Sequence, residues 1–114
     1  MSAGAYDITC EQGATFSRTL TVKDSSGAVR DLSTYTARMQ VRRTQSSSST
    51  LIELTTENGR ISLNSSGEVT LSISATDTAN LSDGGIYDLE LVSSGGDVER
   101  LVEGNFTLAL EVTR

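Results

Sequence analysis

Apolar and polar residues alternate along most of the chain, and turn-forming residues interrupt the alternation at short intervals. The clearest case is the segment 36–42, where Ala37, Met39 and Val41 share one parity and polar residues take the other. A period of two is typical of a strand with one buried face. The other inward-facing sets predicted in this way are Tyr6, Ile8 and Cys10; Phe16, Leu20 and Val22; Ile61 and Leu63; Val69, Leu71 and Ile73; Tyr87, Leu89 and Leu91; and Val98, Val102, Phe106, Leu108, Leu110 and Val112.

Clusters of Gly, Asn, Asp and Ser separate these segments. Asp24–Gly27, Asn64–Gly67 and Ser93–Gly96 predict tight turns, because Gly tolerates the positive φ that many turns require. The dipeptide Asn58–Gly59 is a strong hairpin signal. Gly13 predicts a bend at which the first strand region changes sheets.

Two places depart from the alternation. Ser74 followed by Asp77 resembles a capping box with Asp in place of Glu, which predicts a short helical crossover at residues 74–81. Leu101 breaks the parity of the last strand, which predicts a β-bulge nearby. The whole pattern predicts an all-β chain: an antiparallel immunoglobulin-like β-sandwich of about seven to eight strands. We expect a flexible N-terminal arm at residues 1–5 and a single domain at residues 6–114.

Composition narrows the function classes. The 114 residues include no His, no Pro, no Trp and one Cys. Without His there is no Ser-His-Asp nucleophile and no imidazole metal ligand, and a lone Cys10 cannot form an intrachain disulfide or a Cys-rich zinc site. The net charge of -6 argues against non-specific nucleic-acid binding, and the lack of a long apolar run argues against membrane insertion. We therefore expect no enzyme activity and no catalytic, cofactor-binding or metal-binding residues.

Two pairs of carboxylates are candidates for general acid–base groups. Asp88 and Glu90 share one outward strand face, and Glu99 and Glu103 share another in the predicted pattern. Side chains two residues apart on a strand are about 7 Å apart, which paired catalytic carboxylates can use. A solvated strand face paired with arginines of a neighbouring strand is the favoured interpretation, because no aromatic platform accompanies the carboxylates.

Two oxygen-rich turns are candidates for calcium binding. Asp24–Gly27 and Asp83–Gly85 contain suitable oxygen atoms, but neither has the ligand spacing of an EF-hand loop. Ordinary turns are the favoured interpretation.

Arginines form the one basic cluster of the chain. Arg38 and Arg42 lie outward on the same predicted strand, and Arg43 follows them. A positive strand face on an acidic molecule suits docking to an acidic face of another subunit or of a second copy. The alternative is that these arginines only pair with Asp88, Glu90 and similar residues of the same sheet.

Tyrosines and a serine-rich loop complete the candidate contacts. Tyr35 is the best candidate for an exposed aromatic residue, and the block Ser46–Thr50 predicts a flexible polar loop. The predicted protein-interaction residues are Tyr6, Tyr35, Arg38, Arg42, Ser47 and Ser48.

Several motifs along nearly the whole chain resemble small virion domains of tailed bacteriophages, and in particular the N-terminal immunoglobulin-like domain of phage baseplate upper proteins. The segments that carry the resemblance are Tyr6–Thr9, Glu11–Phe16, Asp31–Arg42, Glu57–Ile61, Ser74–Leu81, Tyr87–Leu91 and Arg100–Gly104. These motifs are structural, consisting of turns and strand alternation.

The resemblance implies a non-enzymatic bacteriophage structural protein, assembled in the host cytoplasm and located in the virion. It would be a tail or baseplate adaptor, or a fibre-attachment subunit, that contacts other virion proteins and copies of itself through sheet edges, loops and the Arg38/Arg42 face. Baseplate upper proteins continue past this domain, whereas the present sequence ends at Arg114. A capsid decoration (cement) protein is therefore kept as the alternative, and a carbohydrate-binding module as a less favoured one.

Overall fold

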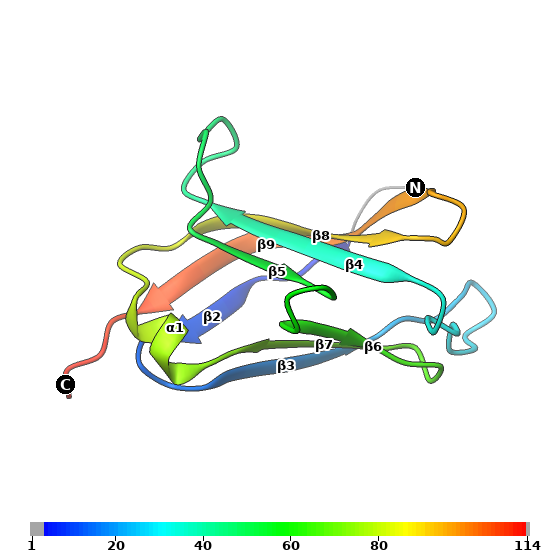
Figure 1. The fold of residues 1–114 in the computed structure, drawn as a ribbon, viewed down its shortest axis with the longest axis horizontal. Helices are drawn as coiled ribbons and strands as arrows, with labels where there is room; N and C mark the ends of the chain where they lie inside the picture. The colour runs from blue at the N-terminus through cyan, green and yellow to red at the C-terminus, as the bar shows by residue number, and fades with distance from the viewer. Residues whose placement is uncertain (1–3, 114) are drawn as a thin grey trace.

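The computed structural model describes residues 4–113 as a β-sandwich of two stacked sheets (Figure 1). The strands are β1 (Gly4–Ala5), β2 (Ile8–Glu11), β3 (Phe16–Thr21), β4 (Thr36–Arg42), β5 (Ile52–Thr55), β6 (Ile61–Leu63), β7 (Glu68–Ile73), β8 (Gly85–Val92) and β9 (Val98–Ala109), and the one helix is α1 (Ala75–Ala79). The predicted all-β sandwich with one short helical crossover is confirmed.

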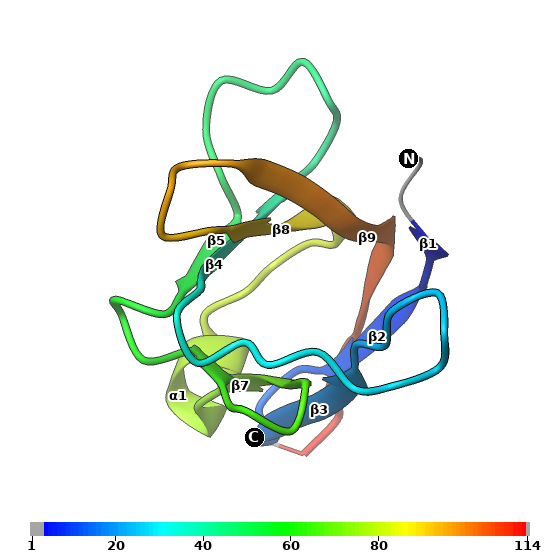
Figure 2. The ribbon, with the colours of Figure 1, turned by 90° about the vertical axis from the view of Figure 1, so that its right-hand side faces the viewer.

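The larger sheet has the strand order β1-β9-β8-β4-β5. Strand β2 also pairs with β9, but further along that strand than β1 does. The smaller sheet has the order β3-β7-β6. Figure 2 shows how β9 bends from the layer of β4, β5 and β8 toward β2 and β3, so that it closes one side of the sandwich. At this side β1 and β2 run parallel to β9, whereas the pairings among β3 to β9 are antiparallel.

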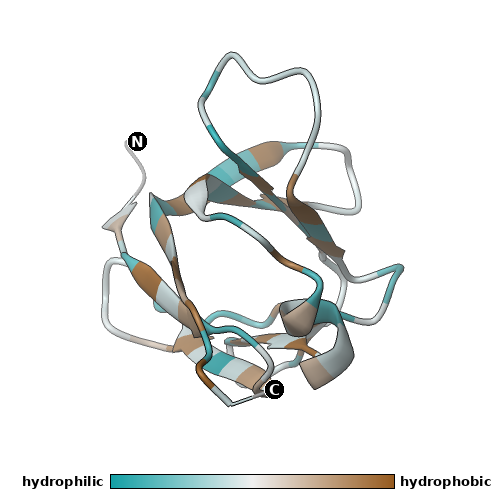
Figure 3. Ribbon diagram, turned by 90° about the vertical axis from the view of Figure 1, so that its left-hand side faces the viewer, coloured by the Kyte–Doolittle hydropathy of each residue, from teal (hydrophilic) through white to brown (hydrophobic). Residues whose placement is uncertain are grey.

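One core joins the two sheets, and its members are the inward-facing residues of the predicted alternation. Leu89 and Leu91 of β8, Val69 and Leu71 of β7 and Val41 of β4 have no exposed surface. In Figure 3 apolar and polar bands alternate along the strands, whereas the loops are mostly of intermediate hydropathy, with some hydrophilic stretches. Burying about twenty apolar side chains is the main source of stability in a domain of this size.

The bend predicted at Gly13 is confirmed. Gly13 has φ +83° between β2, which belongs to the larger sheet, and β3, which belongs to the smaller one. The buried hydroxyl of Thr78 in α1 holds this bend in place. Its Oγ1 accepts a hydrogen bond from the Gly13 N–H (3.0 Å) and donates one to the Ala14 carbonyl (2.8 Å). Ser74 caps α1 by accepting from the Asp77 N–H, as the sequence predicts.

The predicted β-bulge near Leu101 is also confirmed, and it corrects two expectations. The pairing of β8 with β9 shifts register after Leu89, so that Leu89 faces Val102 whereas Glu90 faces Arg100. The extra residue reverses the parity of the first part of β9. Val98, expected to face inward, is therefore 52% exposed on the outer face.

The same shift separates the two glutamates that simple alternation places on one face. Glu99 pairs with the inward residue Leu91, whereas Glu103 pairs with the outward residue Asp88. Glu99 forms two hydrogen bonds with the Arg30 guanidinium, both 3.1 Å long. These two carboxylates are therefore not a pair on one face.

Three further expectations need correction. The Asn58–Gly59 turn does not close a hairpin, because it joins β5 of the larger sheet to β6 of the smaller one. Leu110 and Val112 lie beyond the end of β9 and are 69% and 93% exposed. Gly4 and Ala5, assigned to the flexible arm, pair with Val102 and Glu103, and residues 1–3 lie outside the described part.

Candidate protein-interaction face

The outward side of the larger sheet is a shallow, charged depression of about 950 Å³. We call this surface the outer face, and it consists of Arg38, Gln40, Arg42, Glu53, Ile86, Asp88, Glu90, Arg100, Glu103 and Asn105. These side chains belong to the parity that the core does not use. The loop between β4 and β5 rises beside the face at the carboxyl end of β4 (Figure 1).

The bulge in β9 is the reason that Arg100 and Glu103 both reach this face. Residues three apart on a regular strand point to opposite sides, but the extra residue at Leu101 restores the outward direction. The guanidinium of Arg100 consequently lies 3.4 Å from the Glu103 carboxylate and 3.5 Å from the Asp88 carboxylate.

Ion pairs on the outer face are exposed and weakly held. Arg38 contacts Glu90 at 2.8 Å across the β4–β8 ladder, and the arginine side chain is 54% exposed. Exposed pairs of this kind contribute roughly 0–1 kcal/mol each to stability. They can therefore exchange partners on docking at little cost. The alternative that the arginines pair within their own sheet describes Arg38 correctly, but not Arg42.

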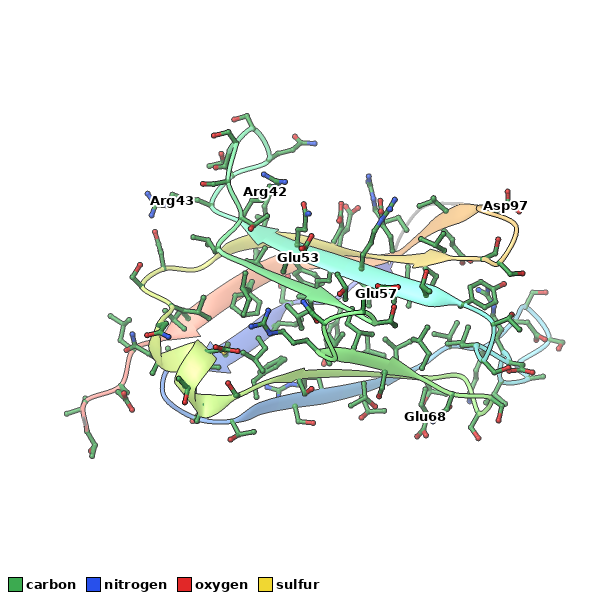
Figure 4. The ribbon with its side chains drawn as sticks, viewed as in Figure 1. Arg42, Arg43, Glu53, Glu57, Glu68 and Asp97 are labelled. Atoms are coloured by element: carbon green, nitrogen blue, oxygen red, sulfur yellow. The ribbon has the colours of Figure 1, made fainter. Side chains whose placement is uncertain are left out.

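Arg42 and Glu53 do not contact each other, but the side-chain amide of Gln40 links them. Arg42 donates to the Gln40 Oε1 (2.8 Å) and to the Ser47 carbonyl (2.8 Å), and the Gln40 Nε2 donates to Glu53 (2.7 Å). Within residues 4–113 neither charged group has an opposite charge within 4 Å. Figure 4 shows Arg42 at the base of the protruding loop and Glu53 on the same sheet.

The six predicted interaction residues do not form one site. Arg38 and Arg42 lie on the outer face, and the protruding loop that borders it contains Ser47 and Ser48. Tyr35 precedes the start of β4, whereas Arg42 is at its end, so the two lie at opposite ends of the strand. The Arg30 guanidinium carbon lies over the Tyr35 ring, 5.6 Å from the ring centroid. The Tyr35 side chain is also half-buried, so the ring offers no open surface on which a sugar could stack.

Tyr6 is likewise half-buried against the core. Its carbonyl accepts a hydrogen bond from the buried hydroxyl of Tyr87. Burial raises the pKa of the Tyr87 phenol, so this hydroxyl stays protonated and continues to donate. Tyr6 therefore fastens the N-terminal segment to β8 and is not part of the outer face.

Sequence reasoning missed Gln40, Glu53 and Arg100 as members of the face. Gln40 lies between two arginines that were named, so the alternation alone contained that signal. Glu53 depends on the pairing of β5 with β4, and Arg100 depends on the bulge. Neither of these long-range features is visible in local sequence patterns.

Comparisons with known proteins bear on the fold. No protein family and no curated protein matches the sequence. Among solved structures, Tim-1 superposes with a TM-score of 0.50 at 17% identity, covering 100% of this chain and 99% of that one. The chain has an immunoglobulin-like fold. A structure from a study of "multimeric cell-adhesive interactions of VGSC beta subunits" has a TM-score of 0.48 at 14% identity, with 96% of both chains covered.

Two edge strands of this immunoglobulin-like sandwich, β5 and β2, are poorly suited to pairing with a further strand. On β5 the Glu53 carbonyl accepts hydrogen bonds from the Asn58 and Arg60 side chains (3.0 and 2.9 Å), and the Thr55 N–H donates to Asn58. Arg18 similarly occupies the Thr9 carbonyl of β2 (3.2 Å). Side chains that occupy edge groups prevent another strand from adding there. This favours the outer face over the sheet edges named above.

Three further features concern metal binding, the Cys10 thiol and membrane-spanning helices. Among residues 4–113, no three His, Cys, Asp or Glu side chains are grouped so that they could hold a metal ion. Cys10 is buried, and burial raises the pKa of its thiol, which disfavours the reactive thiolate. No helix in the described part is long and apolar enough to cross a membrane.

The pKa values of three aspartates predict sensitivity to acid. Hydrogen bonds lower the pKa of Asp24 (from Ser26), Asp31 (from Ser33) and Asp77 (from Arg60). A pKa that is lower in the folded than in the unfolded state stabilises the protein above the unfolded value, about 4. That stabilisation is lost as the pH falls through the folded values.

We therefore expect the free energy of unfolding to fall below about pH 4. In Asp77→Asn the unfolding free energy is lower at neutral pH and changes less steeply with pH in the acidic range, because one of the linked groups no longer titrates. Urea unfolding followed across the acidic range measures both quantities. A pH dependence identical to that of the unaltered protein contradicts this assignment.

Proposed function

We propose that this chain is a non-enzymatic structural subunit of a bacteriophage virion and that it acts by protein–protein contacts through the outer face. One observation supports this contact surface. Hydrogen bonds from and to Gln40 hold Arg42 and Glu53 in place, and neither charged group has an opposite charge within 4 Å among the described residues. Ordered charges without ionic partners favour a complementary protein surface.

The phage assignment rests on the motifs that resemble the N-terminal domain of baseplate upper proteins. Within the virion, a tail or baseplate adaptor or a fibre-attachment subunit is the leading role. Capsid decoration is the second role, since an immunoglobulin-like sandwich with a docking face serves either position. The two roles differ in copy number, because a tail tip holds few or tens of copies and a capsid surface holds hundreds.

Purified particles test the proposal. An antibody raised against the purified chain is expected to label tailed phage particles that encode this sequence, at the tail tip if the leading role is right. Quantitative mass spectrometry of the same particles gives the copy number, and labelling over the whole head with hundreds of copies supports capsid decoration instead. Absence of the chain from washed particles overturns the proposal.

A further inference from the structure

The turn between β5 and β6 contains the exposed dipeptide Asn58–Gly59 (Figure 1). Three backbone groups hold the Asn58 side chain against this turn. Its Oδ1 accepts hydrogen bonds from the Thr55 N–H and the Arg60 N–H, both 3.0 Å long. Its Nδ2 donates to the Glu53 carbonyl (3.0 Å). The carboxamide of Asn58 therefore has a fixed orientation relative to the main chain.

This orientation brings an electrophilic carbon and a nitrogen nucleophile into one small ring. The hydrogen bond from the Arg60 N–H to the Asn58 Oδ1 joins groups two residues apart, so the ring that it closes contains the Asn58 Cγ and the Gly59 nitrogen. The Asn58 side chain thus folds back toward the Gly59 peptide group, as in other Asx turns. Attack of this nitrogen on Cγ would form a cyclic succinimide.

Two features of the turn favour that attack. The two N–H donors on Oδ1 polarise the side-chain carbonyl and stabilise the negative charge that develops on Oδ1 as the new bond forms. The nucleophile is also unhindered, because Gly59 has no Cβ and no atom lies within 4 Å of the position that a Cβ would take. The Gly59 N–H donates to no backbone carbonyl among the described turns and loops, and Gly59 is exposed to solvent.

We propose that Asn58 is a site of deamidation in the folded chain. Hydroxide removes the Gly59 amide proton, and the Gly59 nitrogen forms a bond to the Asn58 Cγ. The Cγ–Nδ2 bond breaks, and Nδ2 takes a proton from water and leaves as ammonia, which regenerates hydroxide. Water then adds to either carbonyl carbon of the succinimide and opens the ring, giving aspartate or isoaspartate at position 58. Water is the one co-reactant, and no oxidation or reduction takes place.

The reaction changes charge and hydrogen bonding at the border of the outer face. The product has one negative charge more than the starting chain, and an oxygen replaces the Nδ2 that donates to the Glu53 carbonyl. The Arg60 guanidinium (2.9 Å) then remains as a donor to that carbonyl. Because Glu53 belongs to the outer face, a reaction that needs no enzyme adds negative charge beside the proposed contact surface. The assignment of the modification site does not depend on the proposed function.

Asn64 provides an internal comparison in the turn between β6 and β7. Its Oδ1 likewise accepts hydrogen bonds from two backbone N–H groups, those of Ser66 and Glu68, at 3.0 Å each, and Asn64 is also exposed. The residue that follows Asn64 is Ser65, whose Cβ crowds the peptide nitrogen that would attack. We therefore expect Asn64 to react more slowly, although its carboxamide is held in a similar manner.

Mass spectrometry of the purified, folded chain after incubation at mildly alkaline pH measures both sites. Trypsin cleaves after Arg43 and Arg60, so the peptide 44–60 contains Asn58 and no other Asn, whereas Asn64 falls in the peptide 61–100. We expect Asn58 to convert roughly tenfold faster than Asn64 or more, because Gly59 leaves the nitrogen open to attack. Chromatography separates the aspartate and isoaspartate forms of the peptide, and a sample that was not incubated corrects for conversion during digestion.

Two glycine variants separate the chemistry from backbone strain. Gly59→Ala and Gly96→Ala replace glycines with φ +81° and +90°, and neither added Cβ has an atom within 4 Å. Both substitutions therefore strain a turn in the same way, but only Gly59→Ala places a methyl group beside the attacking nitrogen. We expect Gly59→Ala to slow the conversion of Asn58 by roughly tenfold and Gly96→Ala to leave it unchanged.

Three results overturn the inference. The first is an Asn58 that stays intact in the folded chain, for example one that converts only when the chain is unfolded in urea. The second is equal conversion of Asn58 and Asn64. The third is a Gly59→Ala variant in which Asn58 converts as fast as it does in Gly96→Ala.

Discussion

Replacing Leu89 with alanine is expected to lower the free energy of unfolding by about 2–5 kcal/mol. Leu89 has no exposed surface, and it lies in the centre of β8 between Met39 of β4 and Val102 of β9. Truncation removes buried methyl groups and leaves a cavity that the neighbouring strands cannot fill without moving. A loss of this size is a large part of the roughly 5–15 kcal/mol by which such domains are stable. Urea unfolding followed by circular dichroism measures it.

Ile86→Ala is the control, because Ile86 lies on the same strand but points to the outer face, where it is 38% exposed. We expect this substitution to cost less than about 1 kcal/mol. Equal losses in the two variants would contradict the assignment of inward and outward parity on β8.

Replacing Gly104 with alanine is expected to have the second large effect and to lower the free energy of unfolding by about 1–3 kcal/mol. A Cβ at this position would lie 2.4 Å from the Tyr6 carbonyl oxygen and 2.8 Å from the Asp7 carboxylate. Backbone contacts this short require the chain to move. Movement here would weaken the hydrogen bond from the Tyr6 N–H to the Glu103 carbonyl (2.9 Å) and that from the Asn105 N–H to Asp7 (2.9 Å).

Gly95→Ala is the matched control for this substitution. Gly95 lies in the turn between β8 and β9, and a Cβ there would meet only the Ser93 Oγ at 3.9 Å. Because alanine reduces the freedom of the unfolded chain, Gly95→Ala is expected to be neutral or to stabilise by up to about 1 kcal/mol. Faster amide hydrogen exchange of Tyr6 and Ile8 in Gly104→Ala would locate the damage at β1 and β2. A Gly104→Ala variant as stable as the control would show that this close approach is not needed.

Local patterns predicted most of the sandwich because each depends on neighbouring residues only. Alternation identified the inward side of β4, β7 and β8, since successive side chains on a strand point to opposite faces. Gly13 indicated the change of sheet because of its freedom at positive φ, and Ser74 indicated the start of α1 through its cap. The candidate site was half predicted: Arg38 and Arg42 lie on the outer face, whereas Tyr6 and Tyr35 are packed elsewhere.

Pairing between strands that are distant in the sequence could not be predicted from local patterns. The Asn58–Gly59 signal is correct as a turn, but the partners of β5 and β6 lie in different sheets, which a local signal does not specify. The parallel addition of β1 and β2 to β9 joins residues nearly one hundred positions apart. Such contacts depend on how the two sheets close over the core, and closure is a property of the whole chain.

By itself, the sequence determined most of the buried positions of β2, β4, β7 and β8 and the places where the chain turns, because the free energy of burying apolar side chains acts on every strand separately. Only the tertiary structure decided which charges stand side by side. The register of β4, β5, β8 and β9 and the single extra residue at Leu101 bring Glu53, Asp88 and Glu103 into one row and Arg38 and Arg100 into the next. A shift of one residue would have turned Arg100 inward, since the side-chain period of a strand is two.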